Sequence, residues 1–289
     1  MRIQWYPGHM TKTRRMIQDQ LKLVDIVCEL LDARIPLSSR NPDIDELAGD
    51  KPRLIILNRV DQADEGETRR WVDYFKGGGF PVLETDCRSG KGVKSFAPEV
   101  RRIMRPRLEQ DREKGRNRPI RALIVGVPNV GKSSLINRLT GQKSAKTENR
   151  PGVTRGKQWF TVERGLELLD TPGILWPKFD DAATGMALAY TGAIRDAIID
   201  TETLAAHLML LLADRYPAAL TGRYKIGPDF SEQNGFDLLE AAARKRGFLI
   251  SGGEVDTQRM ADVLLDEFRG QKLGRITLEP VVCAPEEGV

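Results

Sequence analysis

One eight-residue stretch of the sequence has the residue types and the spacing that bind phosphate. The stretch Gly126-Val127-Pro128-Asn129-Val130-Gly131-Lys132-Ser133 matches G-x-x-x-x-G-K-[ST], follows an apolar strand candidate and opens a helix. Its glycines let backbone N–H groups surround the phosphates, and the helix N-terminus adds a partial positive charge. Lys132 is expected at the β- and γ-phosphates and Ser133 on Mg²⁺. The predicted nucleotide contacts of this phosphate loop are Asn129, Val130, Gly131, Lys132, Ser133 and Ser134.

A second motif, predicted to handle the γ-phosphate, lies downstream of the first. Asp170-Thr171-Pro172-Gly173 follows a short apolar strand candidate and fits D-x-x-G. Asp170 is expected to hold Mg²⁺ through a water molecule, while the Gly173 N–H senses the γ-phosphate. Thr154, in the loop between the two motifs, is the candidate second Mg²⁺ ligand, because switch loops need such a threonine. D-x-x-G is common by itself, and its position after the phosphate loop makes it specific.

A third motif is predicted to read the base of a guanine nucleotide. Asn58-Arg59-Val60-Asp61 ends a strand candidate and is similar to N-K-x-D. Asp61 can accept hydrogen bonds from the two adjacent N–H groups of guanine, which adenine lacks, and a site of that kind discriminates by ~10⁴ or more. Arg59 stands where lysine is usual. Its planar fork is expected to change the contacts with the phosphate loop.

A fourth segment, residues 86–92, occupies the place of a loop that supports the base from its other side. Asp86 and Cys87 replace the serine and alanine that are usual there, and the backbone N–H near Cys87 is expected to meet the guanine carbonyl.

The pattern Asn-x-x-Asp, found here at 58–61, is by itself most often a turn. The prediction of GTP and GDP as ligands therefore depends on both loops following strands of the same sheet.

The predicted elements favour an α/β fold. Strands are expected at 25–31, 54–57, 81–83, 121–125, 158–162 and 166–169, and helices at 10–23, 132–139, 182–190, 201–212, 236–246 and 255–269. Strands that alternate with helices indicate a mostly parallel, doubly wound sheet, whose ligands lie at the carboxyl ends of the strands. Residues 1–177 are predicted to form this domain, with a basic linker at about 105–120. Residues 178–289 are predicted to form a small all-helical domain, in which His207 packs rather than binds a ligand.

The order of the motifs is unusual. The base-reading motifs at 58–61 and 86–90 precede the phosphate loop, Thr154 and D-x-x-G. In ordinary GTPases the phosphate loop comes first, so the sequence predicts a circularly permuted P-loop GTPase domain. The same sheet can form, because the termini of a domain usually lie close together. In this order D-x-x-G leads directly into the helical domain, so the nucleotide state could reorient that domain.

Charge, cysteine content and apolar runs limit the possible partners and the compartment of the protein. The 289 residues carry 45 Lys and Arg against 41 Asp and Glu, a net charge of only +4. Basic residues gather at 101–121, which indicates either a polyanionic partner or a solvated helix and linker. The three cysteines are far apart and odd in number, so a reducing cytoplasm fits best. The longest apolar run, 204–213, is too short to span a bilayer.

Several of these features together resemble a known family. Trp5-Tyr6-Pro7-Gly8-His9-Met10, Asp32-Ala33-Arg34-Ile35-Pro36, the permuted motif order and the helical C-terminal part are similar to the ribosome-biogenesis GTPase A (YlqF/RbgA) family. The resemblance covers essentially the whole chain. It implies slow GTP hydrolysis that ribosomal particles stimulate, a role in late maturation of the large ribosomal subunit, and contact with ribosomal RNA, for which the helical domain is a candidate.

The resemblance also implies roles for two residues that the motifs leave open. Many GTPases place a glutamine after D-x-x-G to orient water, and Ile174 cannot do this. In the family the histidine equivalent to His9 is the proposed catalytic group; the alternative is that His9 packs against or caps the following helix. Related GTPases with an asparagine at the position of Asn129 hold K⁺ near the phosphates; the alternative is a residue that shapes the loop.

Three classes of function remain open. The first is a GTP-driven assembly factor that docks on an immature large subunit and leaves after hydrolysis. The second is an ATPase or small-molecule kinase that shares only the phosphate loop, against which Asn58 and Asp61 argue. The third is a nucleotide-gated RNA-binding module whose hydrolysis is incidental, an alternative that Ile174 keeps open.

Overall fold

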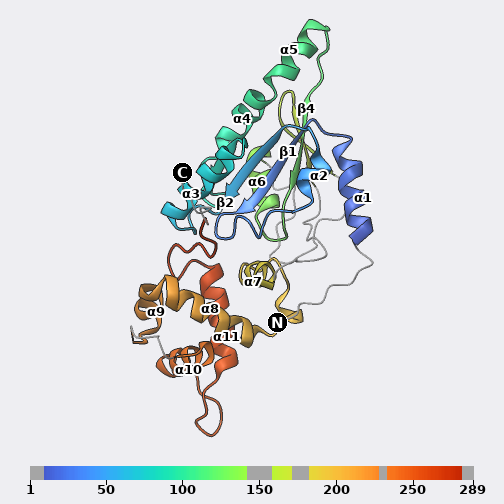
Figure 1. Ribbon diagram of the computed structural model, residues 1–289. Coiled ribbons are helices and arrows are strands. Elements are labelled where there is room, and N and C mark those ends of the chain that lie inside the picture. The colour runs from blue at the N-terminus through green and yellow to red at the C-terminus, as the bar shows by residue number, and fades with distance from the viewer. Residues whose placement is uncertain (1–9, 142–157, 171–181, 228–232, 282–289) are drawn as a thin grey trace, which may run out of the picture.

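The structure is a computed structural model that describes residues 10–141, 158–170, 182–227 and 233–281. At its centre is a six-stranded sheet with the order β3-β2-β1-β4-β6-β5, in which every neighbouring pair is parallel except β5 and β6. The strands are β1 (Ile26–Asp32), β2 (Arg53–Asn58), β3 (Val82–Thr85), β4 (Ile120–Val125), β5 (Gln158–Glu163) and β6 (Leu166–Asp170). The predicted class, an α/β fold with a mostly parallel sheet, is confirmed (Figure 1).

Helices cover both faces of this sheet, which explains why its central strands are apolar throughout. The helices on one face are α1 (Met10–Leu21), α2 (Ile44–Ala48) and α3 (Glu65–Gly77). On that face Val27 of β1 shares an apolar cluster with Ile17 of α1, and Leu57 of β2 shares another with Trp71 of α3.

The opposite face is covered by α4 (Phe96–Ile103) and α6 (Lys132–Thr140). Cys28 and Ile124 of the sheet lie in one cluster with Phe96 of α4 and Leu135 of α6. This cluster continues without a break into the C-terminal helices. The carboxyl ends of β1, β2, β3, β4 and β6 all reach one edge of the sheet, and the predicted motifs follow these ends.

The expected basic linker at 105–120 differs from the structure. Residues Arg105–Glu113 form helix α5, which extends from α4 at the end of the sheet remote from the C-terminal helices (Figure 1). Most arginines of this region are neutralised by ion pairs, which join Arg101 to Glu163, Arg102 to Glu99, Arg105 to Glu109, Arg107 to Asp25 and Asp111, Arg118 to Asp111, and Arg121 to Glu167. The free basic field is therefore smaller than a count of residues suggests.

The C-terminal part is mainly helical, as predicted. Its helices are α7 (Ala182–Tyr190), the short 3₁₀-helix η3 (Asp196–Ile198), α8 (Thr201–Arg215), α9 (Pro217–Tyr224), α10 (Gly235–Arg246) and α11 (Thr257–Arg269). A Cβ atom at Gly235 would lie 2.1 Å from the Ala206 carbonyl oxygen, so α10 begins closer to α8 than any other residue allows. Within the described ranges, no helix is long and apolar enough to cross a membrane.

The segment that follows α11 lies outside the helical part. After α11 the chain returns to the sheet domain, where the Leu278 N–H donates to the Arg34 carbonyl at 2.8 Å and Trp71 Nε1 donates to the Glu279 carbonyl at 2.8 Å. Glu279 in turn accepts from the backbone N–H groups of Leu37 and Ser38. The expectation that residues 178–289 form an all-helical domain therefore omits a segment that fastens the two halves together. The expected boundary at residue 177 lies outside the described residues.

Candidate nucleotide site

The phosphate loop links the end of β4 to the start of α6. Two of its glycines are required by close neighbours: a Cβ at Gly126 would lie 2.6 Å from the Leu30 carbonyl oxygen, and one at Gly131 would lie 2.4 Å from Asn58 Nδ2. Gly131 also has a φ of +106°, which disfavours other residues. Lys132 is buried and its Nζ donates to the Gly126 carbonyl at 3.3 Å, so its side chain folds back over the loop.

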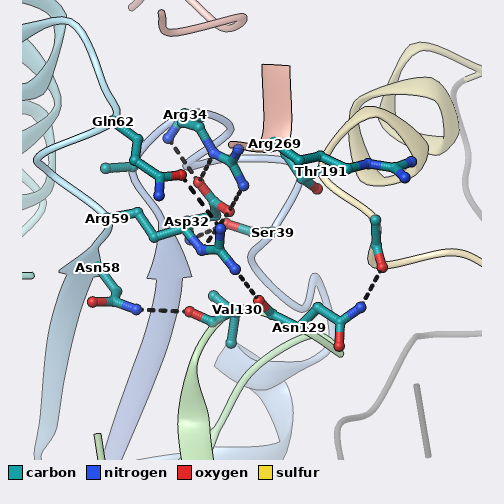
Figure 2. A network of polar contacts seen from close by, with 12 residues as sticks. Asp32, Arg34, Ser39, Asn58, Arg59, Gln62, Asn129, Val130, Thr191 and Arg269 are labelled. Carbon is teal, nitrogen blue, oxygen red and sulfur yellow. Dashed lines mark hydrogen bonds and ion pairs between the residues drawn. The ribbon is translucent and has the colours of Figure 1, made fainter. Parts of the chain in front are cut away.

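The loop at residues 58–62, here called the base loop, holds the phosphate loop by hydrogen bonds to its backbone carbonyl groups. Asn58 Nδ2 donates to the Val130 carbonyl at 2.8 Å, and Arg59 Nη2 donates to the Asn129 carbonyl at 2.6 Å (Figure 2). The Asn58 side-chain oxygen accepts from the Thr85 hydroxyl at 3.2 Å, which ties the end of β3 to the same point. The structure thus brings together two motifs that are 70 residues apart in the sequence.

The surroundings of Asp61 disfavour the charged form of its carboxylate. Burial and the negative charge of Asp86 raise the pKa of Asp61, while Arg59 and Arg88 act in the opposite direction. The two N–H groups of a guanine base would compensate this carboxylate. The backbone on either side is fixed, since the Asp61 carbonyl accepts from Gln271 Nε2 and the Gln62 carbonyl accepts from the Ile276 N–H at 2.9 Å.

Comparison with known proteins agrees with this geometry. A family model described as "50S ribosome-binding GTPase" matches residues 121–228. Ribosome biogenesis GTPase A of Priestia megaterium is 47% identical over 281 residues, which cover 96% of this chain and 97% of that protein. The chain belongs to the ribosome biogenesis GTPase A family. As a member of it, the protein binds guanine nucleotides and hydrolyses GTP.

Other relatives of this ribosome biogenesis GTPase are more distant. Mitochondrial ribosome-associated GTPase 1 of Mus musculus is 41% identical over 217 residues, covering 72% of this chain and 66% of that protein. Among solved structures, GNP-bound YlqF from T. maritima superposes with a TM-score of 0.64 at 32% identity, over 93% of this chain and 98% of that one. The fold of the GTPase is therefore that of a characterised relative along nearly its whole length.

The segment 86–92 of this GTPase is shaped by its own side chains. Asp86 accepts from the backbone N–H of Arg88 at 2.7 Å and of Ser89 at 3.1 Å, and these bonds together with the Ser89 hydroxyl lower its pKa although burial would raise it. The Cys87 N–H, expected to meet the guanine carbonyl, donates instead to the Asn58 side-chain oxygen at 3.2 Å. Burial raises the pKa of the Cys87 thiol to about 12, so it is a packing group.

Asn129 connects the phosphate loop of the GTPase to its helical half. The residue has a positive φ of +60°, and its Nδ2 donates to the Gly192 carbonyl at 2.7 Å, in the turn between α7 and η3 (Figure 2). No sequence pattern predicts this contact, because it joins two polar groups in separate loops. The side-chain oxygen of Asn129 is left as the atom that could hold a cation.

The other predicted site residues are placed in part. Ser133 and Ser134 lie in the first turn of α6, where the phosphate loop passes into the helix. Asp170 ends β6 opposite Ile124 of β4 in the strand register, at the edge of the sheet where the phosphate loop begins. His9, Thr154, Gly173 and Ile174 lie outside the described residues. The segment 270–276 is one of the stretches that resemble the family, but the contacts of Gln271 and Ile276 with the base loop were not predicted from the sequence.

Proposed function

We propose that this GTPase is an assembly factor that acts in the late maturation of the large ribosomal subunit. In its GTP-bound form it docks on a precursor of that subunit and on the ribosomal RNA, and hydrolysis to GDP releases it. The names of the family model and of the relatives support this proposal. A cytoplasmic location and a circularly permuted ancestry of the domain belong to the same proposal.

The observation that carries the proposal is the set of hydrogen bonds that joins the helical half to the two nucleotide loops, here called the joint. Gln271 and Ile276 hold the base loop from the helical side, and Asn129 of the phosphate loop donates to Gly192. Both nucleotide loops are thus fastened to the helical half, for which we propose the contact with RNA. A ligand changes an equilibrium only through contacts that differ between two states, and these bonds are the ones that nucleotide and particle would both affect.

Mg²⁺ and K⁺ are the proposed ions. A hydroxyl from Ser133 and a carboxylate from Asp170 would supply oxygen ligands, which Mg²⁺ prefers. The proposal is supported by the strand register, in which β6 ends beside the strand that leads into the phosphate loop. Thr154 is proposed as a further ligand. When bound, Mg²⁺ would neutralise charge on the β- and γ-phosphates. The side-chain oxygen of Asn129 is proposed to hold K⁺, and His9 to orient the attacking water.

The experiment that tests this function is GTP turnover with and without purified large ribosomal subunits, in KCl and in NaCl at equal ionic strength. We expect slow hydrolysis by the protein alone, within a few decades of the ~10⁻⁴ s⁻¹ of unassisted switch GTPases, and strong stimulation by the particle in KCl. His9→Ala should lose the stimulated rate and keep its GTP affinity. Equal rates with and without particles, at full GTP occupancy, would contradict the assembly role.

A nucleotide-gated RNA-binding module is the second candidate, favoured by the same joint. It predicts that RNA binding follows the bound nucleotide and survives the loss of turnover. Arg112, Lys114 and Lys245 are the basic residues to test, since within the described part of the chain none of them forms an ion pair. If they contact phosphates, RNA binding should weaken steeply with salt. A flat salt response would remove this role.

A further inference from the structure

The motif Asp32-Ala33-Arg34-Ile35-Pro36 is not explained by the site described so far. Asp32 is the last residue of β1, and only 2% of its surface is exposed. Its Oδ1 accepts from the backbone N–H of Arg34 at 3.0 Å and from Arg34 Nε at 2.9 Å, and its Oδ2 accepts from Arg34 Nη2 at 2.7 Å. Arg34 is itself 1% exposed and lies over the Phe268 ring of α11. Three hydrogen bonds and the Phe268 ring therefore hold the pair in place.

A second arginine shares the Asp32 carboxylate. Arg59 Nε lies 3.6 Å from Asp32 Oδ2, on the side away from the fork of Arg34 (Figure 2). Arg59 is the base-loop residue that stands where lysine is usual. Its other nitrogens donate to Gln62 Oε1 at 3.3 Å and to the Asn129 carbonyl at 2.6 Å. One buried carboxylate is thus connected through one guanidinium to the backbone of the phosphate loop.

Peptide geometry gives this connection a consequence for phosphate binding. In a trans peptide the carbonyl and the following N–H point in opposite directions. Arg59 holds the Asn129 carbonyl, which turns the Val130 N–H away from the base loop, and Asn58 does the same for the Gly131 N–H through the Val130 carbonyl. Such N–H groups are the ones that cradle phosphates in a loop of this type.

We propose that Asp32 is a positioning residue of the nucleotide site, which orients the Arg59 guanidinium and thereby the N–H groups of the phosphate loop. An arginine needs such a partner more than a lysine does, because its donors are fixed in one plane. Arg34 and Arg59 together lower the pKa of Asp32 in spite of its burial, so the carboxylate is charged whenever the protein is at work. The effect of Asp32 on the nucleotide passes through Arg59, which contacts both Asp32 and the phosphate loop.

The test is a double-mutant cycle on GDP affinity. Asp32→Asn keeps the shape of the side chain and removes its charge, and we expect GDP to bind roughly tenfold to a hundredfold more weakly, the size of one hydrogen bond to a charged group. The preference for guanine over xanthine should not change, because Asp61 is untouched. In an Arg59→Ala background the same substitution should change the affinity by less than about twofold, because the connection is already broken.

Glu267→Gln is the matched control. Glu267 is also a buried carboxylate shared by two arginines, Arg223 and Arg246, but all three lie in the helical half. This substitution should destabilise the protein and leave GDP affinity within about twofold, which separates positioning from general loss of stability.

Two results would overturn the proposal. One is unchanged GDP affinity in Asp32→Asn, and the other is an equal loss of affinity whether Arg59 is present or replaced by alanine. If Asp32→Asn does not fold, Asp32→Glu takes its place, because it keeps the charge but moves the carboxylate by one methylene. The same cycle with Arg59→Ala then shows whether the effect of Asp32 on GDP affinity depends on Arg59.

Discussion

Two buried carboxylates of this GTPase have nearly the same chemistry and different connections. Asp32 in the sheet half and Glu267 in the helical half are 2% and 4% exposed, and each is shared by two arginines. Glu267 accepts from Arg223 Nε at 2.9 Å, from the Tyr224 hydroxyl at 3.0 Å and from Arg246 Nη2 at 3.2 Å.

The difference lies in what the arginines touch with their remaining donors. Arg59 continues from Asp32 to the Asn129 carbonyl in the phosphate loop. In the part of the chain that the structure describes, the side-chain hydrogen bonds of Arg223 and Arg246 all go to the Glu267 carboxylate, within the helical half. Burial and pairing therefore do not identify a functional carboxylate. What distinguishes the two carboxylates is whether their arginines also contact the phosphate loop. This comparison predicts a series of substitutions whose effects on nucleotide affinity and stability decrease in order.

The largest effect is expected where a carboxylate meets the base directly. Asp61→Asn replaces an acceptor by a donor, so the preference for guanine over xanthine should fall by roughly 10³-fold or more and can reverse, as expected for a site that leaves buried polar groups unpaired with the wrong ligand. Competition of GTP and XTP for the purified protein measures this. Unfolding by urea without nucleotide should be nearly unchanged, since the Asp61 side chain is only partly buried. A variant that keeps full guanine preference would show that Asp61 does not read the base.

The next effect is on stability alone. Glu267→Gln should lower the free energy of unfolding by about 1 to 2 kcal/mol, because two arginines lose their charged partner. The loss is smaller than for a fully buried pair, since the side chains of Arg223 and Arg246 are 36% and 29% exposed and stay partly hydrated. Urea unfolding followed by circular dichroism gives this value, and the GDP titration described above gives the affinity. A large loss of affinity with the expected loss of stability would mean that the helical half controls the nucleotide site more tightly than the bonds at Gln271 and Gly192 suggest.

The same carboxylate predicts a dependence on pH. Hydrogen bonds from Arg223 and Tyr224 and the charge of Arg246 hold the pKa of Glu267 at about 2, against an ordinary value of 4.5. A lowered pKa stabilises the folded state above the unfolded-state value and ceases to do so as the pH falls through the folded-state value. The stability difference between the wild type and Glu267→Gln should therefore shrink between about pH 4.5 and pH 2. A difference that stays constant over this range would contradict the ionised pair.

Much of the sheet half could be predicted from the sequence. All six strands were placed within two residues, because buried parallel strands are continuous apolar runs that end at polar loops. The base loop and the phosphate loop were expected at the same edge, and the bonds from Asn58 and Arg59 to the loop show them there. Helices α3 and α4 were not predicted, although Trp71 and Phe75 have the spacing of a helix face.

Other features could not be predicted, for physical reasons that differ. The segment of helix α5 was predicted to be a linker because Pro106 and Pro119 bracket a basic stretch. Pro106 instead lies in the first turn of the helix, and ion pairs such as that of Arg107 with Asp25 hold the helix to the sheet. His207 was expected to pack and is exposed, because the buried stripe of α8 runs through Leu204, Leu208 and Leu212. The bond from Gln271 to Asp61 joins residues 210 apart, and a single polar contact between loops leaves no periodic signal.

A smaller effect is expected at the joint between the halves. Gln271→Ala removes the bond to the Asp61 carbonyl and, because alanine keeps the Cβ atom, leaves the φ of +64° as disfavoured as before. We therefore expect GDP affinity to fall by about threefold to tenfold, the size of one neutral hydrogen bond. Titration with a fluorescent GDP analogue measures this. Lys272→Ala, one residue further on, is the matched control, since no side-chain bond of Lys272 to the described residues is present. Equal losses in both variants would mean that the segment as a whole, and not the Gln271 bond, supports the base loop.

The smallest effect is expected for an exposed pair of the same chemical type. Arg102 forms a bidentate pair with Glu99 on α4, with its side chain 63% exposed. Solvent screens such a pair, so Arg102→Ala should change the free energy of unfolding by less than about 0.5 kcal/mol and leave GDP affinity unchanged. Urea unfolding at low and high salt measures this, and the wild type and the variant should differ even less in high salt. A loss comparable to that of Glu267→Gln would show that the α4–α5 arm is held by its surface charges. The contrast between buried and exposed arginine pairs would then not explain where this protein is sensitive.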